Sequence, residues 1–306
     1  MKVLFAGSPA SSAQILKFLY LDGFKIVGVI SQPDKRSKRG KNKDPSSVSA
    51  EASKLNLSVY KPEKLDKSFQ NEIKDLEFDF LIVSAYGKIL PEWLLDKARV
   101  APINIHFSLL PKYRGASPIQ SAILDNESKT GISIMEMTKG LDEGPVYSFY
   151  EHEILISDSK IDLEEKLVVL CIQNLGKDLR DIYSKNITPV PQRNDEASYC
   201  KKIDKLSGLI NFSTESAEMI FQKYKAFFGW PGIYFMKNNI VINIHGLREF
   251  DESECGPMDK QFKFIRNGLA VKTIDKTIVI TYLQFPGKRI ISSSDAANSY
   301  SNFFQE

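Results

Sequence analysis

The sequence lacks paired cysteines, long apolar runs and any large excess of one charge. Its three cysteines, Cys171, Cys200 and Cys255, are far apart and form no CxxC pair. This excludes a disulfide framework and a cysteine zinc site, and it is typical of a reducing cytoplasm. No apolar run reaches the roughly 20 residues that a membrane helix needs. The apolar start, 3–6, is also shorter than the roughly 7–15 residues of a secretory signal, so we expect a cytoplasmic protein without a membrane anchor.

Glycine is scarce where a dinucleotide-binding protein would need it. The turn after the first apolar run reads GSPASS, with one glycine and with Pro9 in place of a backbone N–H donor. A dinucleotide-binding turn uses three glycines and free backbone amides facing the pyrophosphate. The sequence therefore argues against an NAD site.

Short apolar runs alternate with helical stretches through the first half of the chain. The runs are VLFAG, IVGVI, SVY, FDFLIVSAYG and VAPINIH, at 3–7, 26–30, 58–60, 78–87 and 100–106. This alternation predicts a Rossmann-like α/β domain with a mostly parallel sheet. Ligands of such sheets bind at the carboxyl ends of the strands, so the residues that follow each strand are the candidates for a site.

The second half of the chain has a different pattern. A helix over about 161–183 closes the first domain, and the Pro-rich, aperiodic segment that follows predicts a linker at 186–204. One helical stretch and five short alternating strands follow within about 100 residues, which is typical of a small barrel of the oligonucleotide-binding (OB) type. We therefore expect domains at 1–185 and 205–306.

Asn104 and His106 end the last apolar run of the first domain, in the stretch NIHFSLLPKYRGASPI. Residues two apart share one face of an extended strand. An imidazole can take a proton near neutral pH, and an amide can donate to a carbonyl oxygen. Together they suit the attack of an amine on a carbonyl carbon. An Asn-x-His pair considered alone, however, is more often a polar strand end without chemistry.

Several separate motifs decide between these interpretations. The stretch 104–119 resembles the signature of the folate-dependent formyltransferases, and TGISIMEMTKGLDEG at 130–144 is similar to that family's strand and Gly-Leu-Asp-x-Gly loop. Four further segments are similar to the members that act on methionyl-tRNA; they lie at 31–48, 198–212, 226–235 and 284–289. The resemblance covers nearly the whole chain, with the motifs in the expected order.

The resemblance implies a site and a formyl donor. Asn104, His106 and Asp142 match the family's catalytic trio, with Asp142 orienting the imidazole and favouring its protonated form. The donor is 10-formyltetrahydrofolate, no metal takes part, and tetrahydrofolate is a binding partner. The implied folate site consists of Ser108, Leu109, Leu110 and Pro111, with backbone groups of Tyr86 and Gly87. Two departures from the family pattern, Phe107 and Pro145, put the packing around the donor in question. His152 and His245, on other predicted strands, are not expected to join the site.

The basic run KRSKRGKNK follows the second predicted strand. A short basic run alone is most simply a solvated loop. In this family, however, the corresponding loop contacts the acceptor stem of the initiator methionyl-tRNA, and six cations suit spaced phosphates. The implied tRNA-binding residues are Lys35, Arg36, Lys38, Arg39, Lys41 and Lys43. Two alternatives are a UDP-amino-sugar N-formyltransferase and a non-catalytic RNA-binding protein. We expect a monomer.

Overall fold

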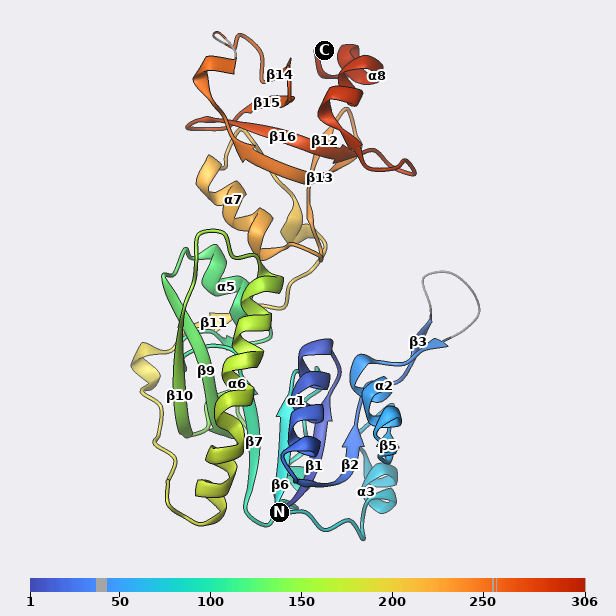
Figure 1. Cartoon of the computed structure of the whole chain (residues 1–306), viewed down its shortest axis with the longest axis vertical. Coiled ribbons are helices and arrows are strands. Elements are labelled where there is room, and N and C mark those ends of the chain that lie inside the picture. Colours follow the sequence, from blue (N-terminus) through green and yellow to red (C-terminus); the bar gives the residue numbers. More distant parts are fainter. Residues whose placement is uncertain (37–42, 255, 257, 306) are drawn as a thin grey trace. The chain divides into compact units, whose positions relative to one another are not determined.

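The computed structural model describes residues 1–36, 43–254, 256 and 258–305 (Figure 1). The chain divides into two compact units. Unit 1 comprises Met1–Ile119, Ser128–Ile154 and Asp162–Lys201, and unit 2 comprises Gln120–Glu127, Leu155–Ile161 and Lys202–Glu306. No helix in these described ranges has the length and apolar character required to cross a membrane.

Unit 1 is built on a seven-stranded, mostly parallel sheet, as the alternating pattern predicted. Its strands are β1 (Lys2–Gly7), β2 (Lys25–Ile30), β5 (Val59–Tyr60), β6 (Phe80–Ser84), β7 (Ala101–His106), β9 (Lys129–Glu136) and β10 (Val146–Glu153). The order is β10-β9-β7-β6-β1-β2-β5, in which β7 to β5 run parallel and β9 and β10 are antiparallel to their neighbours. From β1 the chain proceeds to β2 and β5 on one side, and β6 and β7 then follow on the other side of β1. Ligands of such sheets bind at the carboxyl ends of the strands where the strand order reverses, which here are β1 and β6.

Helices cover the sheet. They are α1 (Ala10–Leu21), α2 (Ser47–Lys54), α3 (Lys67–Glu72), α4 (Glu92–Leu95) and α6 (Lys160–Tyr183), whereas α5 (Pro118–Leu124) falls mostly in unit 2. The helices α1 and α6 lie side by side and parallel (Figure 1). Two contacts show this: Ser11 Oγ lies 3.0 Å from Glu164 Oε1 near their starts, and Asp22 pairs with Arg180 at 2.7 Å near their ends. The predicted helix at 161–183 is thus confirmed as α6.

The basic run forms part of a two-stranded hairpin. Strands β3 (Lys35–Arg36) and β4 (Lys43–Asp44) pair antiparallel. Only the backbone of Lys35, Arg36 and Lys43 is described, and Lys38, Arg39 and Lys41 lie outside the described residues.

Residues 186–201, within the predicted linker, belong to unit 1. Val190 bridges with Val146, and β11 (Tyr199–Cys200) pairs in parallel with β8 (Arg114–Gly115). A short 3₁₀ turn, η1 (Asn194–Glu196), lies between these contacts. This part of the segment therefore packs on the strand ends, and only 202–204 of the predicted linker fall in unit 2.

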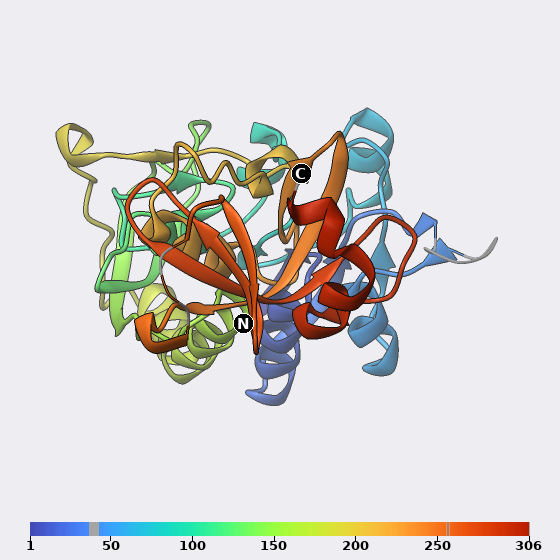
Figure 2. The ribbon, with the colours of Figure 1, turned by 90° about the horizontal axis from the view of Figure 1, so that it is seen from above.

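The described part of unit 2 after Lys202 is an antiparallel sheet with the helices α7 and α8. Its elements are η2 (Leu206–Gly208), α7 (Ala217–Ala226), β12 (Ile233–Lys237), β13 (Ile240–Glu249), η3 (Glu252–Glu254), β14 (Phe262–Ile265), β15 (Gly268–Lys272), β16 (Thr277–Gln284), β17 (Ile291–Ser292) and α8 (Ser293–Gln305). The order is β12-β13-β16-β15-β14, with β17 on β16. Figure 2 shows α8 beside these strands.

Aromatic packing shows that this sheet is curled. Phe235 of β12 and Phe262 of β14 are at opposite ends of the strand order, yet their rings stack with centroids 5.7 Å apart. Phe212 meets both rings edge-on, at 5.2 and 5.9 Å. The two outer strands therefore face one another across a shared aromatic core, as in the small barrel that the sequence predicted.

Candidate active site

The strands β6, β7 and β9 bring the predicted catalytic residues to one edge of the unit 1 sheet. Asn104 lies beside Val83 of β6, and His106 lies beside Ser133 of β9. Their spacing of two along β7 places both side chains on the same face, as expected. His106 is buried, with 5% of its surface exposed.

Asp142 joins these two side chains from the loop between β9 and β10. Its Oδ1 accepts a hydrogen bond from Asn104 Nδ2 at 3.2 Å, and its Oδ2 lies 3.7 Å from His106 Nδ1. The backbone N–H of Gly115 donates to the same Oδ2 at 2.8 Å. The structure therefore brings Asn104, His106 and Asp142 into one cluster.

The other ring nitrogen of His106 fixes the tautomer. Nε2 lies 2.9 Å from the backbone oxygen of Tyr113. Because a carbonyl oxygen only accepts hydrogen bonds, Nε2 carries the hydrogen in this contact. The neutral ring then has its lone pair on Nδ1, which faces Asp142. The lone pair of Nδ1 is thus the basic site of the neutral ring, on the side of the Asp142 carboxylate.

Tyr113 and Gly115 have unusual backbone geometry that serves this contact. Tyr113 adopts a φ of 61°, in the region that most non-glycine residues avoid, and its amide is held by Ser198 Oγ at 2.9 Å. Gly115 has a φ of 122°, and a Cβ at this position would lie 2.4 Å from the backbone oxygen of Cys200. The irregular stretch after β7 thus needs glycine where it packs against β11.

The segment Ser108–Pro111, predicted to line the folate site, is anchored by one hydroxyl. Ser133 Oγ donates to the backbone oxygen of Ser108 at 2.6 Å and accepts from the amide of Leu110 at 3.0 Å. Ser108 Oγ donates to the backbone oxygen of Lys112 at 2.6 Å. Leu110 packs in a small cluster with Met135 and Val146, whereas Leu109 and Pro111 are half-buried. The segment is preorganised, with Leu109 and Pro111 reaching the surface.

Tyr86 and Gly87 follow β6. The Tyr86 side chain is buried in the hydrophobic core, so its backbone is what this residue can offer to a ligand. Its carbonyl oxygen accepts from Gln32 Nε2 at 2.9 Å and from Ser8 Oγ at 3.4 Å. These contacts join the loops that follow β1, β2 and β6 at the carboxyl edge.

The loop after Tyr86 offers groups that suit a pterin ring. In the described part of the chain, no hydrogen bond uses the backbone amides of Gly87, Lys88 or Leu90. Ile89 is 91% exposed and offers an apolar surface beside these donors. A flat heteroaromatic ring with polar edges, such as the pterin of a folate, matches free amides next to an apolar side chain.

Phe107 and Pro145, the two departures from the family pattern, both lie beside the predicted site. Phe107 is buried, with 7% of its surface exposed. The backbone oxygen of Pro145 accepts from the amide of Glu136 at 2.9 Å, which joins the end of the Asp142 loop to β9. The carbonyl of Pro145 therefore fastens the base of that loop to β9.

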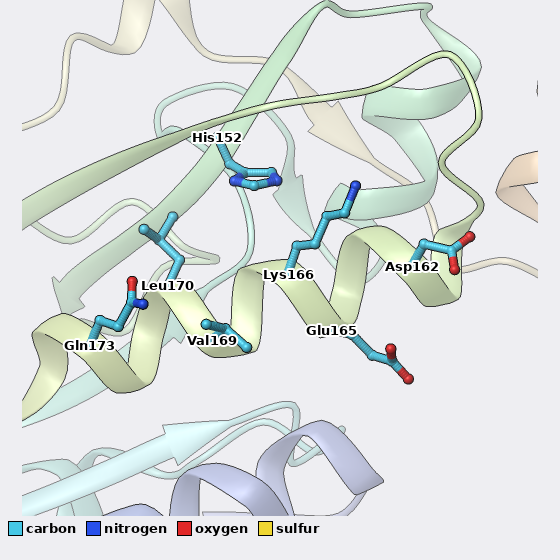
Figure 3. Close-up of a pocket in the computed structure, with 7 residues that line it drawn as sticks. All are labelled: His152, Asp162, Glu165, Lys166, Val169, Leu170 and Gln173. Atoms are coloured by element: carbon cyan, nitrogen blue, oxygen red, sulfur yellow. The ribbon is translucent and has the colours of Figure 1, made fainter.

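The other two histidines lie elsewhere. His245 Nε2 is 3.0 Å from Gln284 Oε1 in unit 2. His152 lies on β10 and faces a shallow hollow along α6 (Figure 3), whose remaining lining residues are Asp162, Glu165, Lys166, Val169, Leu170 and Gln173. None of them belongs to the cluster around His106. Over the residues with described positions, no group of three His, Cys, Asp or Glu side chains has metal-binding geometry.

Sequence reasoning missed three side chains that hold the site together. Ser133 anchors the segment after β7, Ser198 holds Tyr113, and Gln192 Nε2 donates to the backbone oxygens of Asp142 and Gly144 at 2.9 and 2.7 Å. Ser198 and Gln192 lie in an aperiodic segment and reach partners 48 or more residues away. No local pattern indicates such contacts.

Comparisons with known proteins place the chain in a family. Two protein-family models match the chain, one described as Formyl transferase over residues 1–171 and one as Formyl transferase, C-terminal domain, over residues 202–301. A protein of Sulfurihydrogenibium sp. (strain YO3AOP1) named Methionyl-tRNA formyltransferase is 39% identical over 306 residues, covering 98% of this chain and 97% of that protein.

Two solved structures share the fold. WlaRD, a sugar 3N-formyl transferase determined in the presence of dTDP and 5-N-formyl-THF, matches with a TM-score of 0.66 at 21% identity, covering 94% of this chain and 99% of that one. HypX from Aquifex aeolicus in complex with tetrahydrofolic acid matches with a TM-score of 0.66 at 16% identity, covering 99% of this chain and 47% of that one.

Proposed function

The chain belongs to the formyltransferase family, and within it to the methionyl-tRNA formyltransferases, and we propose that it transfers the formyl group of 10-formyltetrahydrofolate to the α-amino group of initiator methionyl-tRNA. The observation that carries the assignment of the site is the cluster of Asn104, His106 and Asp142 at the carboxyl end of β7. Folate-bound relatives of the same fold support the choice of formyl donor.

The reaction needs one group for the oxyanion and one for a proton. The amine of methionyl-tRNA attacks the formyl carbon, and the carbonyl oxygen gains negative charge as the new C–N bond forms. Asn104 uses one N–H on Asp142 Oδ1, and its amide nitrogen also lies 4.0 Å from Met135 Sδ, a weak acceptor. The second N–H can leave this sulfur and donate to the developing oxyanion.

The proton of the attacking amine then goes to His106. Nε2 is engaged with Tyr113, so Nδ1 is the nitrogen that can accept it, and Asp142 stabilises the imidazolium. When the bond between the formyl carbon and N10 breaks, the proton returns to N10, which leaves as the amine of tetrahydrofolate. Atoms and charges balance without a metal.

The remaining partners rest on the sequence. We assign the tRNA acceptor stem to the basic hairpin, because a run of six cations fits spaced phosphates better than the two phosphates of a sugar nucleotide. The folate site comprises Ser108–Pro111 and the backbone of Tyr86 and Gly87. A monomeric state and a cytoplasmic location complete the proposal, and light scattering after size-exclusion chromatography tests the first.

The test is a comparison of formyl acceptors. Purified protein is incubated with 10-formyltetrahydrofolate and either methionyl-tRNA or a UDP-amino sugar, and formylated product is measured. We expect transfer to methionyl-tRNA alone. Transfer to the sugar nucleotide alone would favour the sugar N-formyltransferase, and binding of RNA without any transfer would favour the non-catalytic alternative.

A further inference from the structure

The side-chain amide of Gln192 forms two hydrogen bonds to the loop that carries Asp142. Nε2 donates to the backbone oxygens of Asp142 and Gly144, at 2.9 and 2.7 Å. Both hydrogens of one amide are therefore used on the same loop. Asp142 has a φ of 50°, a left-handed conformation that a non-glycine residue keeps only with outside support. The Gln192 amide supplies that support at the carbonyl of the same residue.

Arg114 determines which way this amide faces. Its Nε and Nη2 donate to Gln192 Oε1 at 3.0 and 2.9 Å, and Nη2 also donates to Asn194 Oδ1 at 2.8 Å. Arg114 is 1% exposed, so its guanidinium depends on these acceptors. With the amide oxygen of Gln192 held by Arg114, its NH₂ group must face the Asp142 loop.

The residue next to Arg114 holds the same loop from its other side. The N–H of Gly115 donates to Asp142 Oδ2 at 2.8 Å. The carboxylate of Asp142 is thus held through Gly115, and its carbonyl is held through Gln192. Gly115 makes the first contact directly, and Arg114 orients the Gln192 amide that makes the second. These two neighbouring residues form β8.

We propose that Gln192 is a positioning residue for formyl transfer: its amide, oriented by Arg114, holds the Asp142 loop so that the carboxylate stays against His106 and Asn104. This inference rests on the proposed function, because it concerns the same site. The amide of Gln192 is fully used on Arg114 and the two loop carbonyls, so it has no hydrogen left to donate to a substrate. Its effect should therefore appear in turnover rather than in substrate affinity.

Gln192→Glu is the sharpest variant. A glutamate has the same length and still offers acceptor oxygens to Arg114, but it has no hydrogen to donate to the two loop carbonyls. We expect kcat to fall roughly 10- to 100-fold, since a misplacement of about 1 Å can cost that much. KM for both substrates should stay within about threefold. Gln173→Glu, the same change on the exposed face of α6, is the matched control and should behave like wild type.

An NMR measurement tests the same contact without any substrate. The Gly115 amide donates to a carboxylate, and such charge-assisted bonds are short and strong. In Gln192→Glu, we expect the Gly115 amide proton to move upfield as Asp142 leaves, whereas Gln173→Glu should keep the wild-type position. If Gln192→Glu does not fold, Gln192→Asn replaces it, because the shorter amide cannot span Arg114 and both carbonyls.

The outcomes separate two kinds of failure. Wild-type protein without formyl transfer to methionyl-tRNA would overturn the proposed function, while the Gly115 signal would still report on the Gln192 contact. Wild-type kcat and an unmoved Gly115 signal in the Gln192 variant would overturn the positioning role. They would show that Gln192 only supplies an acceptor to Arg114, which a glutamate also provides.

Discussion

His106 is held at Nε2 by a main-chain oxygen, so its other nitrogen faces Asp142. We predict that His106→Ala and Asn104→Ala each lower kcat by about 10²–10⁴, the range for losing a general base or an oxyanion donor. Equilibrium binding of tetrahydrofolate should change much less. His152→Ala, outside the cluster, is the control. Either variant with near-wild-type turnover would remove that side chain from the chemistry.

The sequence could predict the candidate catalytic cluster but not the residues that hold it. Asn104 and His106 share a strand end, and Asp142 lies in a Gly-Leu-Asp-x-Gly loop, so spacing and resemblance together predicted that these three side chains meet. Gln192 acts through two backbone oxygens about 50 residues away. Every residue has a backbone oxygen, so the sequence does not indicate which ones a distant side chain contacts. Only the three-dimensional structure shows such a contact.

Tyr86 offers a stability test at the same scale. Its hydroxyl is buried and has no hydrogen-bond partner among the described residues, and burial raises the pKa of Tyr86 to about 12. A buried unsatisfied group costs roughly 1–3 kcal/mol. We therefore predict that Tyr86→Phe keeps or increases the free energy of unfolding at pH 7, measured by urea titration.

The stability of wild type and of Tyr86→Phe should depend differently on pH above about 10. The folded protein holds the Tyr86 proton more tightly than the unfolded chain, so wild type loses stability as pH rises from about 10 to about 12. Tyr86→Phe cannot ionise there and should lose less stability than wild type over this interval. Equal losses in both proteins would show that the hydroxyl ionises without opposition from the fold.

Strand β9 provides a matched pair of hydroxyls at the scale of an element. Ser133 Oγ bridges Ser108 and Leu110, whereas Thr130 Oγ1 is buried with no partner in the described ranges. We predict that Ser133→Ala destabilises the fold by about 1–3 kcal/mol and weakens tetrahydrofolate binding several-fold, since the folate segment loses its anchor. Thr130→Val should be close to neutral in both calorimetry and binding. Equal behaviour of the two variants would contradict the anchoring role.

The elements themselves were predicted to different extents. The parallel strands and α6 follow from apolar runs and helical periodicity, and the carboxyl-edge position of the site follows from the parallel sheet. The pairing of β8 with β11 was not predictable, because two-residue strands carry no periodic signal. The helix α8 was also missed, since its sequence is rich in serine and asparagine, which are weak helix formers.

The whole molecule must bring a charged macromolecule to a small site, and the basic hairpin is assigned that task. We predict that Arg39→Ala combined with Lys41→Ala raises KM for methionyl-tRNA while tetrahydrofolate binding is preserved. The logarithmic salt slope of tRNA binding should become shallower by roughly one to two units, at about 0.7–0.9 per lost phosphate contact. Affinities across a salt series test this, and an unchanged slope and affinity would mean that the hairpin does not touch RNA.

The parallel pairing of β8 with β11 has a consequence for the order of events during synthesis on the ribosome. The three predicted catalytic side chains have all been made once residue 142 is polymerised, yet Tyr113, whose carbonyl contacts the imidazole, is held by Ser198. A nascent chain can therefore form most of the sheet early, but the site waits until about residue 200 has left the exit tunnel. Catalytic competence should arise late and abruptly during elongation, rather than growing with the length of the folded sheet.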